Sequence, residues 1–445
     1  MIKKTYKIPM HSRKNILILL SALIYLSYFL GFFFNENSIG SGGYQGDISW
    51  ILENFKIFQN NSLKDAINHK DFFGNRTPLL YLINVILNPF VNNYEYYRYS
   101  IFIFSLIGPI IFYLCLEKKF KNIQKEILFF ISSIILLSPY YRTTAYWGME
   151  INYAIITMLI SCYYLIIINF NNPISDIKKI ILLIFFSSIT IYFDQKFIFL
   201  PILIYGKIIF FTQNIKVKLI TTITYFILSI PYLYLIIIWE GVVPTRTQVH
   251  NPNTITNLNR LGNLYFYHLG YASTIIGFYL FPLLFFKEKN IFQLISDFVS
   301  KKSTYFILLI PVIYIIYMFN FIDYKFYTVD EYWVGLGVVH KLSLFLFENL
   351  KFQEIFTYLM FFLSWIVIFL FIEIKLRDLL VLLFFFFLSL FNWPLMQEHF
   401  DLVITLSALL LFKTKLKITY NNSVFIFLYS VVFLVIANIY YIKIL

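Results

Sequence analysis

The run ILILLSALIYLSYFLGFFF, residues 16–34, decides the fold class of this chain. Its 19 residues carry no charge, and a helix needs roughly 17 to 25 apolar residues to cross the hydrocarbon core of a bilayer. Basic residues precede the run, and its last four residues, Gly31-Phe32-Phe33-Phe34, do not form a small-residue cleavage site. We therefore expect an uncleaved membrane anchor and not a signal peptide.

Composition extends this interpretation to the whole chain. Hydrophobic residues make up 60% and charged residues 13% of the 445 residues, and the mean hydropathy is +0.73. These values exclude an ordinary soluble domain. The net charge of +13 comes from Lys and Arg that lie between apolar runs without forming a basic stripe, so it indicates membrane orientation and argues against a nucleic-acid partner.

The same length requirement, applied along the chain, predicts an all-α polytopic membrane protein with about 13 transmembrane helices. These are residues 15–34, 99–117, 124–139, 150–170, 177–193, 196–212, 218–238, 269–286, 304–321, 355–374, 377–395, 399–413 and 423–443.

The apolar run 78–93 is ambiguous, and the basic residues decide its interpretation. If this run only enters the interface, all the basic clusters fall on the side of the N-terminus, as the positive-inside rule requires. We therefore predict a re-entrant or juxtamembrane helix here, with a cytoplasmic N-terminus and an external C-terminus in the plasma (inner) membrane. The clusters are at 118–125, 178–179, 216–218, 287–302, 375–377 and 413–417.

This topology places the larger connections outside, at 35–98, 139–150, 239–268 and 322–354, and leaves only short basic turns inside. No fixed-period repeat or linker marks a second domain, so residues 1–445 form a single integral membrane domain with its functional site on the external face. The two cysteines lie inside apolar runs, and neither they nor the histidines have metal-ligand spacing, so we assign no metal ligands.

The first external loop contains the segment Gly46-Asp47-Ile48-Ser49-Trp50. From Asp47 to residue 59, apolar side chains recur at helical spacing, which predicts an amphipathic helix lying on the membrane. Asp47 at its start has two interpretations: an N-cap that binds free backbone N–H groups, or a catalytic carboxylate.

Other polar residues reach the same face. Glu150 opens a predicted span, where it either faces a polar cavity or favours the helix N-terminus through the dipole. Arg76, Arg142 and Lys196 either bind an anion or anchor the chain at lipid headgroups.

Four features occur in order over about residues 15–200: Asp47, Arg76 before Pro78-Leu79-Leu80-Tyr81, Arg98-Tyr99-Ser100, and Ser138-Pro139 to Glu150. In this order and on the predicted external face, they resemble the GT-C glycosyltransferases. These integral membrane enzymes use polyprenyl-phosphate sugars and include protein O-mannosyltransferases and the aminoarabinose transferases of lipid A. Many members carry Asp-Glu or Asp-Asp where this chain has Asp47-Ile48, which leaves the subfamily open.

The resemblance implies a catalytic half at 1–212, with its external loop at 35–98, and a variable transmembrane half at 213–445, with external loops at 239–268 and 322–354. It implies sugar transfer from a polyprenyl-phosphate donor to a glycan, lipid or protein acceptor at the external face. Asp47 is then the catalytic base, and Glu150 is a second catalytic acid that orients the acceptor or, in metal-using variants, helps to bind a divalent cation.

The remaining assignments follow from the charge of the departing phosphate, which cations stabilise. Arg76, Arg142 and Lys196 are the candidates for binding the donor phosphate, and Arg is suited to bidentate contact. Candidates for acceptor or loop contacts are Arg246, Arg260 and Gln195.

Two other functions stay open. An O-antigen or polysaccharide polymerase or ligase would use arginines in mid-chain external loops, which Arg246 and Arg260 offer. A polysaccharide flippase or other transporter would place its polar groups along the spans. Lys207 is the main charged residue of that kind, so transport is the weaker alternative.

Overall fold

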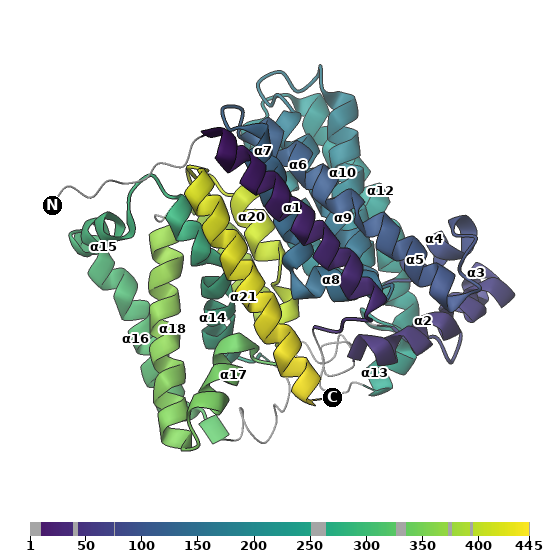
Figure 1. The fold of residues 1–445 in the computed structure, drawn as a ribbon. Coiled ribbons are helices and arrows are strands. Elements are labelled where there is room, and N and C mark those ends of the chain that lie inside the picture. Colours follow the sequence, from purple (N-terminus) through teal and green to yellow (C-terminus); the bar gives the residue numbers. More distant parts are fainter. Residues whose placement is uncertain are drawn as a thin grey trace.

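The computed structural model describes residues 10–38, 43–74, 76–250, 264–325, 335–372, 376–391 and 395–444. Within these ranges the ordered elements are helices, with no β-strand, so the predicted all-α class is confirmed (Figure 1). The helices are α1 (Met10–Phe33), α2 (Gly43–Asn60), α3 (Leu63–Ile67), α4 (Leu79–Leu87), α5 (Tyr94–Ser105), α6 (Ile107–Lys119), α7 (Lys125–Ser133), α8 (Pro139–Tyr146), α9 (Ile151–Ile167), α10 (Ile177–Phe193), α11 (Phe199–Phe211), α12 (Ile215–Trp239), α13 (Thr245–His250), α14 (His268–Leu280), α15 (Ile291–Val299), α16 (Lys302–Phe321), α17 (Gly337–Leu346), α18 (Leu350–Ile372), α19 (Leu376–Ser389), α20 (Val403–Leu410) and α21 (Tyr420–Ile444). Short 3-10 turns are η1 (Ile134–Leu137), η2 (Gln195–Ile198), η4 (Pro282–Phe286) and η6 (Gln397–His399).

In the described residues, seven helical segments are long and apolar enough to cross a membrane, or eight if the pair α7–η1 and α8, bent by 65°, forms one span. The protein is therefore a multi-pass membrane protein, but the count of thirteen is not confirmed. The other five predicted spans coincide with shorter helices, namely α9, α10, α11, α19 and α20 of 17, 17, 13, 14 and 8 residues.

The ambiguous run 78–93 contains α4, which has nine residues and begins after Pro78. At 1.5 Å per residue this helix is about 13 Å long, less than half of a typical ~30 Å hydrocarbon core. By length alone α4 does not cross the hydrocarbon core, which agrees with the predicted re-entrant or juxtamembrane helix; its position in the membrane stays a prediction.

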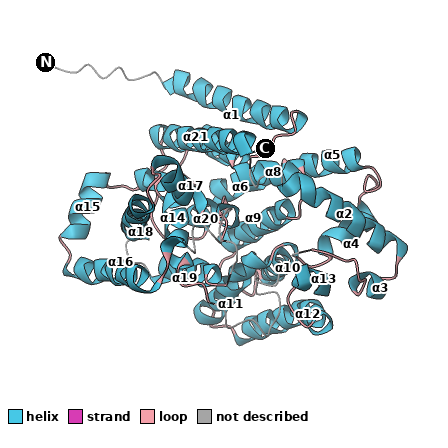
Figure 2. Ribbon diagram, turned by 90° about the horizontal axis from the view of Figure 1, so that it is seen from below, coloured by secondary structure: helices cyan, strands magenta, loops and turns pink. Residues whose placement is uncertain are grey.

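The helices form two groups, with α1 and α21 lying across one face (Figures 1 and 2). In the first group α9 packs against α6 and α10, and in the second α14 packs against α18. The helix α12 packs on α10 and α11, so the first group extends beyond the predicted boundary at residue 212.

The two ends of the bundle differ in what they carry. The described start of α1 and the turn between α6 and α7 lie at one end, whereas α2, α3, α13 and the end of α21 lie at the other (Figure 1). This separation agrees with the topology predicted from the basic residues, in which the N-terminus and the larger loops lie on opposite sides of the membrane. The assignment of the two ends to cytoplasm and exterior stays a prediction.

The predicted amphipathic helix exists as α2, but its apolar face does not lie on the membrane. Ile51, Phe55 and Phe58 are buried in the protein, and the rings of Phe55 and Phe58 pack on Tyr81 of α4 at centroid distances of 5.7 and 5.6 Å. The pattern reflects protein packing, which gives the same periodicity as membrane binding. The N-cap interpretation of Asp47 is also wrong, because the helix begins one turn earlier.

The ion pair between Arg142 and Glu36 joins α8 to the chain that follows α1. Arg142 donates through Nε to Glu36 Oε1 at 2.9 Å, and its Nη2 also contacts the second oxygen of that carboxylate. Ser27 Oγ and Ser27 O, each at 2.9 Å, and Leu136 O at 3.2 Å accept the other bonds. Five bonds occupy the donor capacity of a guanidinium, and the side chain is only 3% exposed.

Arg142 is thus a structural residue, and its assignment to the donor phosphate is wrong. Asn438 of α21 also donates to Glu36, at 3.3 Å. The pair therefore fixes three elements of the bundle, α1, α8 and α21, against one another.

We expect Arg142→Met to destabilise the protein by about 3–5 kcal/mol, because it leaves the Glu36 carboxylate buried without its cation. Thermal unfolding of the purified protein in detergent measures this loss. The matched control is Lys289→Met, which removes an ion pair with Asp297 whose side chains are 61% and 46% exposed and which contributes at most about 1 kcal/mol. Equal stability of the two variants would contradict the structural role.

Candidate functional site

Polar side chains from five parts of the chain converge where helices end, near α2. They come from α2, the α3–α4 connection, the turn before α9, the chain around η2, and η6. We call them the charged cluster, which consists of Asp47, Arg76, Glu150, Asp194, Lys196 and Glu398.

The centre of the charged cluster is Arg76. Its Nε lies 3.2 Å from Glu150 Oε1 and 3.9 Å from Asp194 Oδ1. The two carboxylates are largely buried, with exposed fractions of 15% and 5%, whereas Arg76 keeps 23% of its side chain accessible. The guanidinium thus lies between two acids, and the side chain keeps part of its surface exposed.

Lys196 extends this alternation of charges. Its Nζ lies 3.0 Å from Asp194 Oδ2 and donates to the Tyr140 hydroxyl at 2.9 Å. Burial opposes ionisation of Asp194, but Lys196 and Arg76 together hold the pKa of this carboxyl below its ordinary value. Two cations and two anions therefore form a compact, electrically balanced network.

The segment that carries the central arginine is held at three points. Asn54 of α2 donates to Phe73 O at 2.5 Å and accepts from Phe73 N at 3.3 Å. The Thr247 hydroxyl of α13 bonds both the N–H and the carbonyl of Gly74, each at 3.0 Å. The Thr77 hydroxyl donates to a carbonyl in the last turn of α10. These bonds fix the loop without using the guanidinium itself.

Asp47 projects from α2 with an exposed side chain. Loss of hydration and the negative charge of Glu150 raise the pKa of Asp47 to about 6, against the lowering effect of Arg76. A carboxylate with this pKa is mostly ionised at neutral pH and is a stronger base than an ordinary aspartate. It can therefore accept a proton from a bound hydroxyl.

Glu398 of η6 is a member of the cluster that the sequence analysis missed. Burial and the charges of Asp47 and Asp194 raise the pKa of Glu398 to about 7, although Lys196 and Arg76 act in the opposite direction. The signal was present: Gln397-Glu398-His399 is a polar turn between the predicted spans 377–395 and 399–413, on the predicted external side. A list of charged residues in every external turn would have included it.

Asp401, three residues further on, anchors the helix that leads into the cluster. Its Oδ2 accepts from Ser138 Oγ at 2.8 Å and from Tyr140 N at 3.2 Å, at the first turn of α8. The sequence analysis included Asp401 in an apolar span. A charged residue inside such a run was the available sign that it meets a specific partner.

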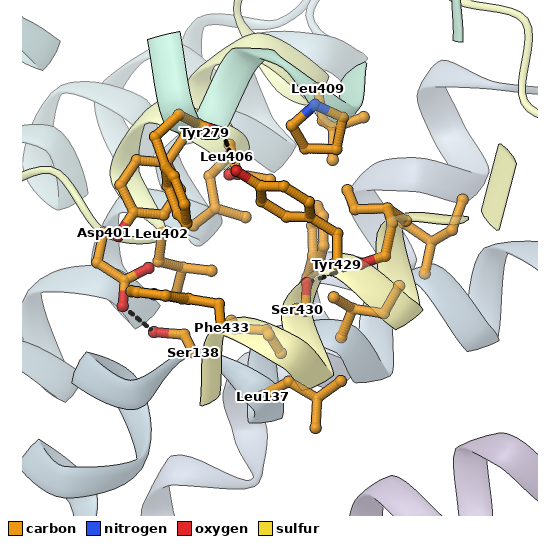
Figure 3. Close-up of a pocket in the computed structure, with 18 residues that line it drawn as sticks. Leu137, Ser138, Tyr279, Asp401, Leu402, Leu406, Leu409, Tyr429, Ser430 and Phe433 are labelled. Carbon is orange, nitrogen blue, oxygen red and sulfur yellow. Dashed lines mark hydrogen bonds between the residues drawn. The ribbon is translucent and has the colours of Figure 1, made fainter. Parts of the chain in front are cut away.

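Beside this contact is an apolar cavity of about 60 Å³ between η1, α14, α20 and α21, with Ser138 and Asp401 at its edge (Figure 3). Ligand pockets usually have ≈ 300–1,000 Å³, and about 60 Å³ accommodates only a few waters. This cavity is therefore too small for a sugar donor.

Three other predicted site residues, Arg142, Arg246 and Gln195, make hydrogen bonds to groups outside the cluster. Arg142 is occupied by Glu36, as described above. Arg246 donates to Asp71 O at 2.7 Å and lies 3.6 Å from Asp71 Oδ1. Gln195 donates to Val242 O at 3.2 Å and so ties η2 to the chain after α12. Arg260 lies outside the described residues.

The donor set does not fit a divalent cation. Among the residues that the structure describes, no group of three His, Cys, Asp or Glu side chains could hold a metal ion. Glu150 and Asp194 instead direct their oxygens at Arg76. We therefore derive no step through a metal.

Comparison with protein-family models, curated proteins and solved structures finds no match to this chain.

The balanced network has a measurable signature in stability. We expect Lys196→Met to destabilise the parent protein more than it destabilises the Asp194→Asn variant. In the parent, loss of Lys196 leaves the buried Asp194 carboxylate partly uncompensated, whereas in Asp194→Asn that charge is already absent. A double-mutant cycle from thermal unfolding should give a coupling of about 0.5–3 kcal/mol. Additive losses would show that the two side chains do not act as a pair.

Proposed function

We propose that this protein is an integral membrane glycosyltransferase that transfers a sugar from a polyprenyl-phosphate donor to a glycan, lipid or protein acceptor. The observation that carries the proposal is the carboxylate of Asp47, whose pKa is raised to about 6, in one cluster with the partly buried cations Arg76 and Lys196. The proposal includes a GT-C-like arrangement of about thirteen crossings, a cytoplasmic N-terminus and a site on the external face of the plasma membrane.

The reaction assigns a task to each charge. An acceptor hydroxyl attacks the anomeric carbon of the donor, the bond from that carbon to the phosphate oxygen breaks, and polyprenyl phosphate leaves with the bonding electrons. Asp47 takes the hydroxyl proton. Its exposure makes it accessible to an acceptor, and its pKa of about 6 keeps it ionised at neutral pH.

The leaving phosphate gains negative charge in the transition state, so fixed cations accelerate its departure. Arg76 and Lys196 are the cations of the charged cluster, and 23% and 16% of their side chains are exposed. We assign both to the donor phosphate. Glu150 and Asp194 hold these cations in place before the donor binds, so no ordering is required during the reaction.

Glu398 complements the two cations, Arg76 and Lys196, as an uncharged hydrogen-bond donor. With a pKa of about 7, a substantial fraction of this side chain is protonated at neutral pH. A protonated carboxyl donates a hydrogen bond to a phosphate oxygen, whereas an ionised one would repel it. We assign Glu398 to the donor phosphate in its protonated form.

A polysaccharide polymerase or ligase is the second candidate, favoured by the exposed Arg246 beside the loop that carries Arg76. Profiles of surface glycan with and without the gene separate the two. Loss of one side-chain sugar supports the transferase, and collapse to a single repeat unit supports the polymerase. A transporter is disfavoured because the charged cluster lies at helix ends and not along the spans.

Asp47→Asn tests the catalytic base directly. We expect the transfer rate from a polyprenyl-phosphate sugar in isolated membranes to fall by about 100-fold or more, because the amide cannot accept the proton. Glu53→Gln on the exposed side of the same helix is the matched control and should keep the parent rate. An active Asp47→Asn enzyme would exclude this residue as the base.

The pH profile tests both carboxyls. The value of kcat/KM should rise with pH through about 6 as Asp47 loses its proton, and fall above about 7 as Glu398 loses the proton that it donates. Glu398→Gln keeps a donor that does not titrate, so this variant should lose the alkaline decline and retain the acidic limb. A profile that Glu398→Gln leaves unchanged would refute the role of Glu398.

A further inference from the structure

A second cavity, of about 540 Å³, is lined by four lysines and one acid. Lys119 ends α6, Lys207 belongs to α11, and Lys413 and Lys415 follow α20, while Glu288 is the one acidic residue of the lining. We call this the basic cavity. Its charged lining sums to +3 when all five side chains are ionised, so it favours an anion.

The basic cavity lies far from the charged cluster. Leu165 and Ile166 near the end of α9 form part of its wall, whereas Glu150 comes just before the start of the same helix. Fifteen residues at 1.5 Å each separate Glu150 from Leu165 by about 22 Å along the axis. The cavity is a separate site, at the end of the bundle that the sequence assigns to the cytoplasm.

Two of its lysines are partly withdrawn from solvent. Lys207 is half-buried within an apolar helix, and its Nζ lies 4.0 Å from the centre of the Phe170 ring. Lys119 is also half-buried and donates to Phe412 O at 3.1 Å. A lysine in such apolar surroundings is costly, and an anion in the adjoining cavity reduces that cost.

The wall that carries the other two lysines is built before any ligand binds. The fully buried Asp378 accepts from Lys413 N at 2.8 Å, from Thr414 N at 3.0 Å and from Thr414 Oγ1 at 2.8 Å. This carboxylate therefore holds the backbone, and the exposed side chains of Lys413 and Lys415 extend from a fixed segment.

Apart from Thr414, the rest of the lining is apolar and includes Phe120, Leu165, Ile166 and Leu410 to Phe412. We propose that the basic cavity binds the phosphate group of an anionic ligand, with the lysines in contact with the phosphate. The apolar wall favours a phospholipid over free phosphate, because a phospholipid also has an apolar part that can contact this wall. Lysine is a common phosphate ligand, and basic pockets between membrane helices on the cytoplasmic side are suited to lipid headgroups. The inference does not depend on the proposed glycosyl transfer.

The experiment uses the purified full-length chain, delipidated in a neutral detergent. Phosphatidylglycerol, phosphatidylcholine and inorganic phosphate are titrated separately while the unfolding midpoint is recorded, and native mass spectrometry counts retained lipid. We expect phosphatidylglycerol to raise the midpoint by several degrees and one molecule to be retained, with little effect of phosphatidylcholine. Lys207→Met should weaken this binding at least tenfold.

The matched control is Lys216→Met, an exposed lysine in the first turn of α12 that lies outside the cavity lining. If Lys207→Met does not fold, Lys415→Ala changes an exposed lining residue and should weaken binding at least threefold. If inorganic phosphate saturates the cavity and blocks binding of phosphatidylglycerol, the cavity is a phosphate site, and the proposal that its ligand is a phospholipid is overturned. Equal stabilisation by both lipids, or equal weakening by Lys216→Met, would overturn the site itself.

Discussion

The buried pair of Arg142 and Glu36 is the interaction on which the arrangement of this protein depends. It occupies every donor of the guanidinium and joins α8 to the end of α1, while Asn438 brings in α21. Because α8 leads directly into Glu150, the position of the charged cluster depends on this contact. Arg142, which the sequence analysis assigned to phosphate binding, thus stabilises the surroundings of the charged cluster without belonging to it.

The charged cluster obeys a related constraint. Arg76 and Lys196 alternate with Glu150 and Asp194, so four ionised groups lie together near the bundle with no net charge among them. Such balance limits the cost of partial burial and holds each group in one orientation. Asp47 and Glu398 lie beside this network with pKa values of about 6 and 7, in the range where a carboxyl exchanges protons at neutral pH.

The sequence predicted much of this because hydrocarbon imposes simple rules. Apolar length located the helices, and the basic turns predicted that 78–93 does not span. The predicted side of the membrane placed Asp47, Arg76, Glu150 and Lys196 on one face. The structure brings those four together. The number of crossings was less predictable, since helices such as α11 and α20 are shorter than their apolar runs.

The errors concerned residues whose meaning depends on distant partners. The partner of Arg142 lies 106 residues earlier, and nothing in the local sequence indicates that Glu36 is the one. Periodicity located α2 but did not reveal that its apolar face meets Tyr81 and not lipid. Glu398 lies in a short polar turn between two predicted spans, and the length of that turn gives no sign that it reaches the charged cluster.

The contact of Asp401 with the start of α8 has a consequence for how the chain is assembled. Ser138 Oγ and Tyr140 N both donate to a carboxylate that lies more than 260 positions later in the sequence. During synthesis, the first turn of α8 has no access to this acceptor until nearly the whole chain has emerged and inserted. The start of α8 therefore completes its hydrogen bonds late, and a nascent chain that stops before Asp401 contains Asp47, Arg76 and Glu150 but lacks this contact.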